Sequence, residues 1–401
     1  MGQACSEKSL RLTIILLGLF ACSLTARAED IQWSGFFSTG IAFSDQSVPY
    51  SDNAIVKEPN IGHETTLGLN LAKALSPSLT MAAQVLANED NADSALKADW
   101  AFVTYTPIAG LELTVGKQKL PMWLVSSYID VDALYPWAHP PDEVYLLFPL
   151  KTFTGASVRY SLPVGPTILA IQPYGGEATT EVAPSAPTAD SKVRAQHMFG
   201  TSVEWTWNKT VARAAYNRAM WDLDFGDTLK IGQRRFELMS YGLQSEWHHV
   251  MLMAEYATTK DLDDQKYQDL SKELAGEAVA AANRGDKEEA GKLITQALVY
   301  GFHFGGSKAY YVTAGYQFTH MALYLTQANL KKTPMAGASE DQSSTALGVN
   351  IEPDETSVVK LEAKRIALPN ESRGLFKDPT KDELKGLNGA MIYSVNYSLT
   401  F

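Results

Sequence analysis

The sequence predicts an all-β fold, a single transmembrane barrel closed by sixteen antiparallel strands. Short segments in which apolar and polar residues alternate recur along the chain, and a period of two residues indicates β-strands. Tight turns and long loops alternate between these segments, which is typical of membrane barrels. After residue 28, no apolar stretch reaches the ~20 residues that a membrane-spanning helix needs.

Composition supports a folded chain that crosses the membrane without helices. Of the 401 residues, 45% are hydrophobic and only 20% are charged, which excludes a disordered protein. The slightly negative mean hydropathy excludes a bundle of membrane-spanning helices. Barrels of this length form one domain.

The first 28 residues predict a secretory signal peptide. Lys8 and Arg11 precede an apolar run over 12–24, and the small-residue site 26–28 predicts cleavage before Glu29. We therefore divide the chain into a signal peptide, 1–28, and a barrel domain, 29–401. A membrane anchor and a lipoprotein site are the alternatives.

Both cysteines, Cys5 and Cys22, fall inside this leader, so the mature chain has neither disulfides nor thiolate metal ligands. Removing Lys8, Arg11, Arg27 and Glu7 lowers the 34 basic and 45 acidic residues to 31 and 44, a net charge of −13. This charge argues against a nucleic-acid partner, whose phosphates would be repelled.

Sixteen segments carry the strand pattern. Accurate to a few residues at each end, we predict strands over 31–43, 64–74, 78–87, 98–107, 111–118, 153–161, 167–174, 197–207, 210–218, 235–247, 250–258, 308–318, 321–327, 343–351, 355–366 and 389–401. Tight turns, such as Asn208 and Lys209, follow the even-numbered strands. Loops of about ten residues or more follow the odd-numbered ones. A soluble sandwich has no reason to sort its loops in this way.

The two faces of each strand differ in polarity. In the last segment one face carries Met391, Tyr393, Val395, Tyr397, Leu399 and Phe401, and the other carries Ser394, Asn396, Ser398 and Thr400. Aromatic residues gather near strand ends, as in the girdles of membrane barrels, although a sandwich core would also collect them. Burying an unpaired polar group costs roughly one to three kcal/mol, so we expect the polar face to be wet and the barrel to enclose water.

The sixth outer loop, 259–307, is expected to carry a helical insertion. Between Asp263 and Leu298 the apolar residues change to a helical period, with a break at Asn283 to Gly285. Two amphipathic helices are predicted, which pack on each other, on the barrel mouth, or on a partner.

Three short motifs, in this order, resemble the general bacterial porins. They are Trp33 to Phe36 in the first strand, Val115 to Gln118 at the end of the fifth, and Tyr393 to Phe401 at the terminus. The resemblance covers the whole mature chain. It implies a homotrimer in the outer membrane, in contact with lipid, that passes ions and small hydrophilic solutes by passive diffusion through a water-filled channel.

The resemblance also implies that the third outer loop, 119–151, folds inward and narrows the pore. The candidate constriction residues are the loop acids Asp130, Asp132, Asp142 and Glu143 and the bases Lys117, Arg159, Arg213, Lys360 and Lys364. An acidic loop facing a basic wall would set a transverse field across the pore. Lys117 matches the basic family position, yet alternation puts it on the lipid side, so either a bulge turns it inward or the assignment is wrong. The loop has prolines where the family has an acidic, aromatic and glycine run, and its aromatics either stack on solutes or pack on the wall.

Enzyme function is not expected. The Gly155 to Ser157 segment continues as Val158 and Arg159 rather than completing G-x-S-x-G, and no H-E-x-x-H occurs. The seven histidines are scattered, so no catalytic residue, metal site or cofactor is predicted. The alternative to a channel is a plugged barrel with an adhesive or structural role.

Overall fold

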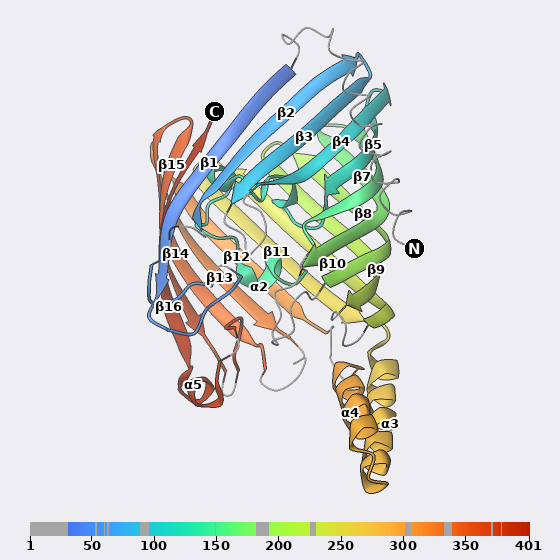
Figure 1. Cartoon of the computed structure of the whole chain (residues 1–401). Coiled ribbons are helices and arrows are strands. Elements are labelled where there is room, and N and C mark those ends of the chain that lie inside the picture. The colour runs from blue at the N-terminus through green and yellow to red at the C-terminus, as the bar shows by residue number, and fades with distance from the viewer. Residues whose placement is uncertain are drawn as a thin grey trace.

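The computed structural model describes residues 31–52, 54–59, 61, 64–88, 96–148, 150–181, 192–224, 230–300, 306–332, 339–369, 372–377 and 379–401. The expected signal peptide, 1–28, lies outside the described residues. The strands form one closed antiparallel barrel in which each pairs with its sequence neighbours and β1 pairs with β16, which confirms the predicted fold class (Figure 1).

The sixteen strands agree with the predicted segments in number and order. They are β1 (Ile31–Ser44), β2 (Thr66–Ser76), β3 (Leu79–Asn88), β4 (Leu96–Ile108), β5 (Leu111–Lys119), β6 (Thr152–Val164), β7 (Thr167–Glu181), β8 (Lys192–Trp207), β9 (Thr210–Asp224), β10 (Lys230–Trp247), β11 (Val250–Asp261), β12 (Lys308–Gln317), β13 (Met321–Lys331), β14 (Gln342–Asp354), β15 (Ser357–Ala367) and β16 (Gly389–Thr400). β7 to β10 extend further than expected. Register shifts at Gly176/Ala178, Gln196/Phe199 and Ile231/Arg234 reset the alternation there, so a strict two-residue pattern ends too early.

Connections sort by length as predicted. The tight turns after the even-numbered strands form one rim, here called the turn rim, and the longer connections form the opposite loop rim. Helices α3 (Asp264–Asn283) and α4 (Lys287–Tyr300) occupy the expected helical segment and project from the loop rim (Figure 1). They pack on each other through Ala278, Ala281, Ala290 and Ala297. The short helix α5 (Lys381–Gly386) lies in the eighth outer loop.

The outer face of the barrel is apolar and exposed. Trp33 and Trp247 are 66% and 73% exposed, and Leu347 is 59% exposed. Such a surface is stable against hydrocarbon, and a closed antiparallel barrel with an apolar outer band is characteristic of bacterial outer-membrane proteins. The chain is therefore an outer-membrane β-barrel.

Among the described residues, no helix is both long enough and apolar enough to cross a membrane.

Two glycines make room for large side chains inside the barrel. A Cβ on Gly348 of β14 would lie 2.0 Å from the Tyr324 ring, and a Cβ on Gly242 of β10 would lie 2.6 Å from Leu124. Because Leu124 belongs to the third outer loop, Gly242 marks where that loop meets the wall.

Candidate functional site: the third outer loop inside the barrel

The third outer loop, residues 119–151, lies inside the barrel. It forms the short helices η3 (Ser126–Tyr128), η4 (Asp132–Leu134) and α2 (Asp142–Tyr145). Helix α2 lies within the ring of strands and packs against β11, β12 and β13 (Figure 1). Pro149 lies outside the described residues.

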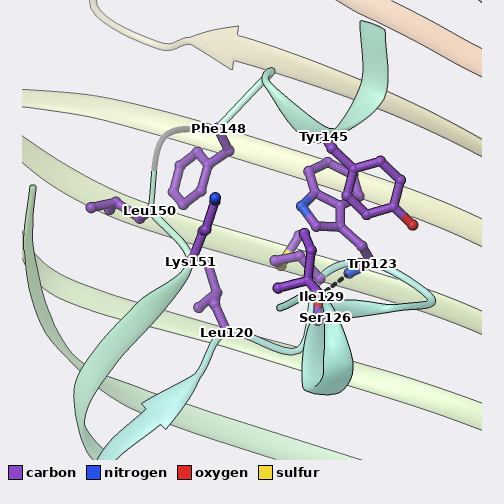
Figure 2. Close-up of a pocket in the computed structure, with 9 residues that line it drawn as sticks. Leu120, Trp123, Ser126, Ile129, Tyr145, Phe148, Leu150 and Lys151 are labelled. Atoms are coloured by element: carbon purple, nitrogen blue, oxygen red, sulfur yellow. Dashed lines mark hydrogen bonds between the residues drawn. The ribbon is translucent and has the colours of Figure 1, made fainter. Parts of the chain in front are cut away.

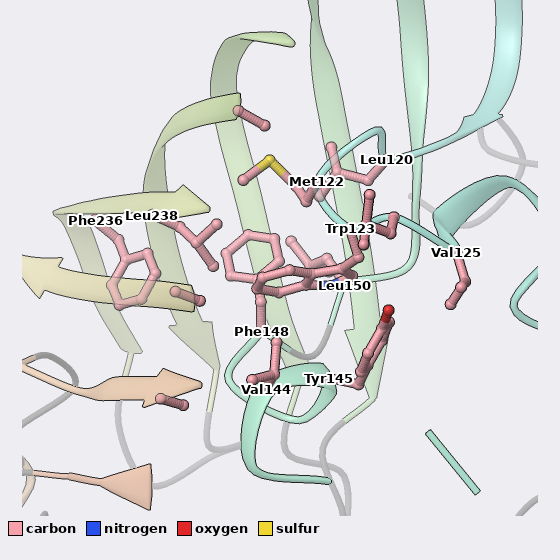
Figure 3. Close-up of a cluster of buried hydrophobic side chains, with 14 of the residues drawn as sticks. Leu120, Met122, Trp123, Val125, Val144, Tyr145, Phe148, Leu150, Phe236 and Leu238 are labelled. Carbon is pink, nitrogen blue, oxygen red and sulfur yellow. The ribbon is translucent and has the colours of Figure 1, made fainter. Parts of the chain in front are cut away.

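On one side the loop packs against a dry wall. In Figure 3, Trp123 and Phe148 lie beside Phe236 and Leu238 of β10. The Phe148 ring centroid lies 5.9 Å from that of Phe236 and 5.6 Å from that of Trp221. The buried strand residues of this cluster come from β6 to β13 and are Phe153, Tyr174, Ala178, Ala195, Met198, Ala215, Ala219, Trp221, Phe236, Leu238, Met253, Ala257, Ala309, Tyr311, Tyr324, Ala328 and Leu330.

The polar residues of this wall bond to the loop instead of to water. Ser240, 2% exposed, donates to the Met122 carbonyl at 2.5 Å. The Trp137 indole Nε1 donates to the hydroxyls of Thr313 and Thr326 at 2.9 and 3.0 Å. The expectation of a wet inner face is therefore wrong where the loop meets β10, β12 and β13, because the inserted loop supplies the partners that water was expected to supply. Nearer the turn rim, Thr206 of β8 and Gln244 of β10 are partly exposed.

A small cavity of about 10 Å³ remains within the loop, which is room for a single water (Figure 2). It is lined by Leu120, Trp123, Tyr145 and Phe148 among others, and beside it Ser126 Oγ accepts a hydrogen bond from the Trp123 amide at 2.8 Å. Its size makes it a packing gap rather than a solute site. The aromatic residues of the loop therefore pack the loop against the wall.

Glu255 on β11 holds the loop from the wall side. Its carboxylate, 3% exposed, accepts hydrogen bonds from the Leu124 amide at 3.0 Å, from the Tyr311 hydroxyl at 2.8 Å and from the Tyr145 hydroxyl. Sequence reasoning did not select Glu255. Alternation places it on the inner face, but no local pattern indicates its three donors.

β15 supplies two lysines that hold the loop on the other side. Lys360 is fully buried, and its ammonium donates to Asp132 Oδ1 at 3.0 Å and to the Trp137 carbonyl at 2.7 Å. It also lies 4.4 Å from the centroid of the Tyr135 ring. Lys364 forms an ion pair with Asp142 at 2.5 Å.

Asp142 is also bound from the first outer loop, because Ser51 Oγ donates to it at 2.8 Å. Burial opposes the charged form of Asp142, but Lys364 outweighs burial and lowers the pKa of the carboxyl. The neighbouring Glu143 is fully buried and accepts from Gln342 Nε2 at 2.8 Å. These two acids face the wall and not open water.

Arg159, Arg213 and Asp130 also form ion pairs inside the barrel. Arg159 and Arg213 both pair with Glu204 on β8, Arg159 at 2.9 Å, and Arg213 also donates to the Trp123 carbonyl. Asp130 pairs with Lys119, which also pairs with Asp99 at 2.6 Å.

Lys117 does not join these contacts. Its register partners, Ala101 and Thr154, lie on the outer face with Val115, and its ammonium donates to the Ala98 carbonyl at 2.8 Å. No register shift separates it from Val115, so no bulge turns it inward. Its assignment to the constriction is wrong.

The predicted transverse field requires acids and bases on opposite sides of open water. The structure instead places the loop acids Asp132 and Asp142 in direct contact with the wall bases Lys360 and Lys364. Charges joined in pairs cancel over a short distance, so these residues anchor the loop rather than polarise a gap.

His139 adds an anchor near the start of β2. Its Nε2 lies 2.7 Å from Glu64 Oε2. Burial disfavours the charged ring, but the Glu64 carboxylate outweighs burial and raises the pKa of His139 to about 9. The imidazolium form therefore predominates at neutral pH.

The first and eighth outer loops close over the same side of the barrel. The Tyr50 ring lies 5.0 Å from the Phe376 ring, and Gln342 Nε2 donates to the Tyr50 hydroxyl at 2.9 Å. With Ser51 bonded to Asp142, three outer loops pack together over β14 to β16 and β1.

The inner wall of β1 to β5 keeps polar residues in reach of water. Asn70, Trp100, Thr104 and Thr114 are partly exposed, and Thr80 is exposed. Because these side chains point into the barrel, the water they contact is lumenal. The loop thus fills one side of the interior and leaves the other side wet.

Two aromatic residues of this wet wall, Trp100 and Phe102, were missed. Alternation places them with Thr104 and Thr106, opposite Val103 and Tyr105, which was the available signal.

Within the described part of the chain, no three metal-ligating side chains come together.

No protein-family model matches the chain, and no curated protein sequence matches it. Solved structures do. OmpF of Salmonella typhi, in complex with daunomycin, gives a TM-score of 0.55 at 13% identity, over 92% of this chain and 97% of that one. In-vitro folded OmpT, an outer-membrane protein of Vibrio cholerae, gives 0.53 at 12% identity, over 92% and 97%. A triple mutant of the Rhodopseudomonas blastica porin gives 0.50 at 10% identity, over 92% and 100%. At these identities the likeness shows the fold.

Proposed function

We propose that the chain is an outer-membrane channel for the passive diffusion of ions and small hydrophilic solutes. The observation that supports this is the wet inner wall of β1 to β5, opposite a loop that is fixed to β8 to β16. A wall that carries the exposed Thr80 and the partly exposed Asn70, Thr104 and Thr114 is stable beside water, and sixteen strands enclose enough space for an aqueous path. The loop narrows this path.

Assembly as a homotrimer belongs to the proposal. A structure of the similar Vibrio cholerae OmpT is in a trimer form, with a TM-score of 0.52 at 11% identity over 92% of this chain and 99% of that one. Cross-linking of the folded protein in detergent would give a trimer band. We propose no catalytic role, since the candidate charges of the loop and its wall bond to one another or to neutral groups and hold the loop in place.

A second candidate, a plugged barrel with an adhesive or structural role, is favoured by one observation. Three outer loops interlock through Tyr50, Ser51, Asp142 and Phe376 over part of the barrel mouth. If these contacts extend across the mouth in the membrane, the interior is sealed.

Planar bilayers separate the two candidates. Folded full-length protein added to the bilayer should give stepwise currents, which a boiled sample should not give. A matched variant replaces residues 121–150 by a short Gly/Ser link. If the wild type conducts and the variant gives larger current steps, the channel is supported. A silent wild type beside a conducting variant would reject the channel in favour of the plug.

A further inference from the structure

Hydrogen-bonded neighbours on four strands build a neutral surface on the wet wall. The register aligns Ser34 of β1 with Asn70 of β2, Asn70 with Gln84 of β3, and Gln84 with Trp100 of β4. These residues share the lumenal face, and on it Gln84 Nε2 donates to Asn70 Oδ1 at 2.8 Å.

The amide row ends at a pair of aromatic rings. Trp100 and Phe102 point inward from β4, and their ring centroids lie 5.1 Å apart with 25° between the planes. Both rings are partly exposed, in contrast to the buried rings of Trp123 and Trp137 in the loop. A large apolar surface that faces water inside a pore is available to a solute.

Hydroxyl groups continue the surface beside the rings. Thr104 follows Phe102 by two residues, and its hydroxyl lies 3.0 Å from that of Thr114 on β5. Thr80 of β3, which pairs with Thr104, is exposed, and Asn70 is partly exposed. Hydrogen-bonding side chains thus lie on both sides of the apolar patch, and none of them carries a formal charge.

From this arrangement we infer that the wall of β1 to β5 is a binding track for neutral sugars that pass through the barrel. A pyranose ring has an apolar C–H face and an edge of hydroxyls, and hydroxyls both donate and accept. Trp100 and Phe102 match the apolar face, while Asn70, Thr80 and Thr104 match the hydroxyl edge. The inference rests on the proposed channel function and names its preferred solute class.

Charge argues for neutral solutes over ionic ones. The arginines that could hold an anion, Arg159 and Arg213, already pair with Glu204. Lys360 and Lys364 are buried beneath the loop with Asp132 and Asp142. The track therefore selects by ring shape and hydroxyl pattern.

The test measures how maltotriose reduces the ion current of the full-length protein in planar bilayers. The Trp100→Leu/Phe102→Leu variant keeps an apolar wall but removes the rings. Loss of aromatic stacking worth about 0.5–1.5 kcal/mol at each ring, about 1–3 kcal/mol for both, predicts a half-blocking concentration about five- to 140-fold higher. Trp205→Leu on the lipid face is the matched control and should block like the wild type.

Three outcomes are distinguishable. A conducting wild type that maltotriose blocks, with weaker block in the double variant alone, supports the track. Conduction without block, or equal block in all three proteins, overturns the track and leaves the channel standing. A silent bilayer rejects the channel and the track together.

Discussion

Lys360 shows how much depends on one side chain. It is fully buried and joins the loop to β15 through Asp132, the Trp137 carbonyl and the Tyr135 ring. The Lys360 ammonium and the Asp132 carboxylate can be buried together because each is the charged partner of the other. The pair fixes where the loop lies, whatever its net contribution to stability.

We predict that Lys360→Ala releases the loop. The change leaves the Asp132 carboxylate buried without its cation, a cost of about 3–5 kcal/mol. Protease should then cut the loop in folded protein, and bilayer currents should become larger and noisier. The double variant Lys360→Met/Asp132→Asn should recover much of the protection.

Lys209→Ala is the control for this prediction. Lys209 pairs with Glu246 on the turn rim, but their side chains are 70% and 43% exposed, and such pairs contribute about 0–1 kcal/mol. Unchanged protease resistance in Lys360→Ala would show that other contacts hold the loop alone.

At the scale of elements, local patterns predicted the strands because strand pairing here is between sequence neighbours. The turn after each even-numbered strand sets its register, so a two-residue period is enough. The pose of the loop escaped prediction because it depends on distant partners such as Glu255 and Lys360. For the same reason, the sequence could not show that the loop acids and the wall bases form ion pairs instead of facing each other across open water.

The loop as an element should respond to alkaline pH through His139. The pKa of His139 is raised to about 9, above the ordinary value of about 6.5. Its contribution to holding the loop is therefore complete below about pH 6.5 and is lost as pH rises through 9. Open-channel current noise should increase over this range.

The variant His139→Gln should show that noise already at pH 6 and little change up to pH 9. A rise with pH that is identical in wild type and variant would assign the effect to another group. Asp142 and Glu362 also act on His139, and Asp142, with its lowered pKa, stays ionised throughout this range.

At the scale of the whole molecule, the ion pairs around the loop carry no net charge. The ion pairs of the loop and its wall join five bases, Lys119, Arg159, Arg213, Lys360 and Lys364, to five acids, Asp99, Asp130, Asp132, Asp142 and Glu204. These pairs thus contribute nothing to the net charge of the mature chain, −13 from 31 basic and 44 acidic residues.

We therefore predict weak ion selectivity. Across a tenfold KCl gradient the reversal potential should stay well below the roughly 59 mV of an ideally selective pore. Arg213→Ala should move it toward cation preference and Asp130→Asn toward anion preference. If neither substitution moves the potential, these residues do not face the conducting path.

The anchors of the loop also set an order of assembly. Asp132 and Lys360 are 228 residues apart in sequence, and closure of the barrel needs β16 to reach β1. Contacts between such distant segments form slowly. While the chain emerges from its N-terminus, residues 119–151 exist long before β15 does, so the nascent protein must keep this apolar segment apart from other chains. We therefore expect export of the chain to depend on chaperones that cover this loop until its anchors on β11 and β15 have been made.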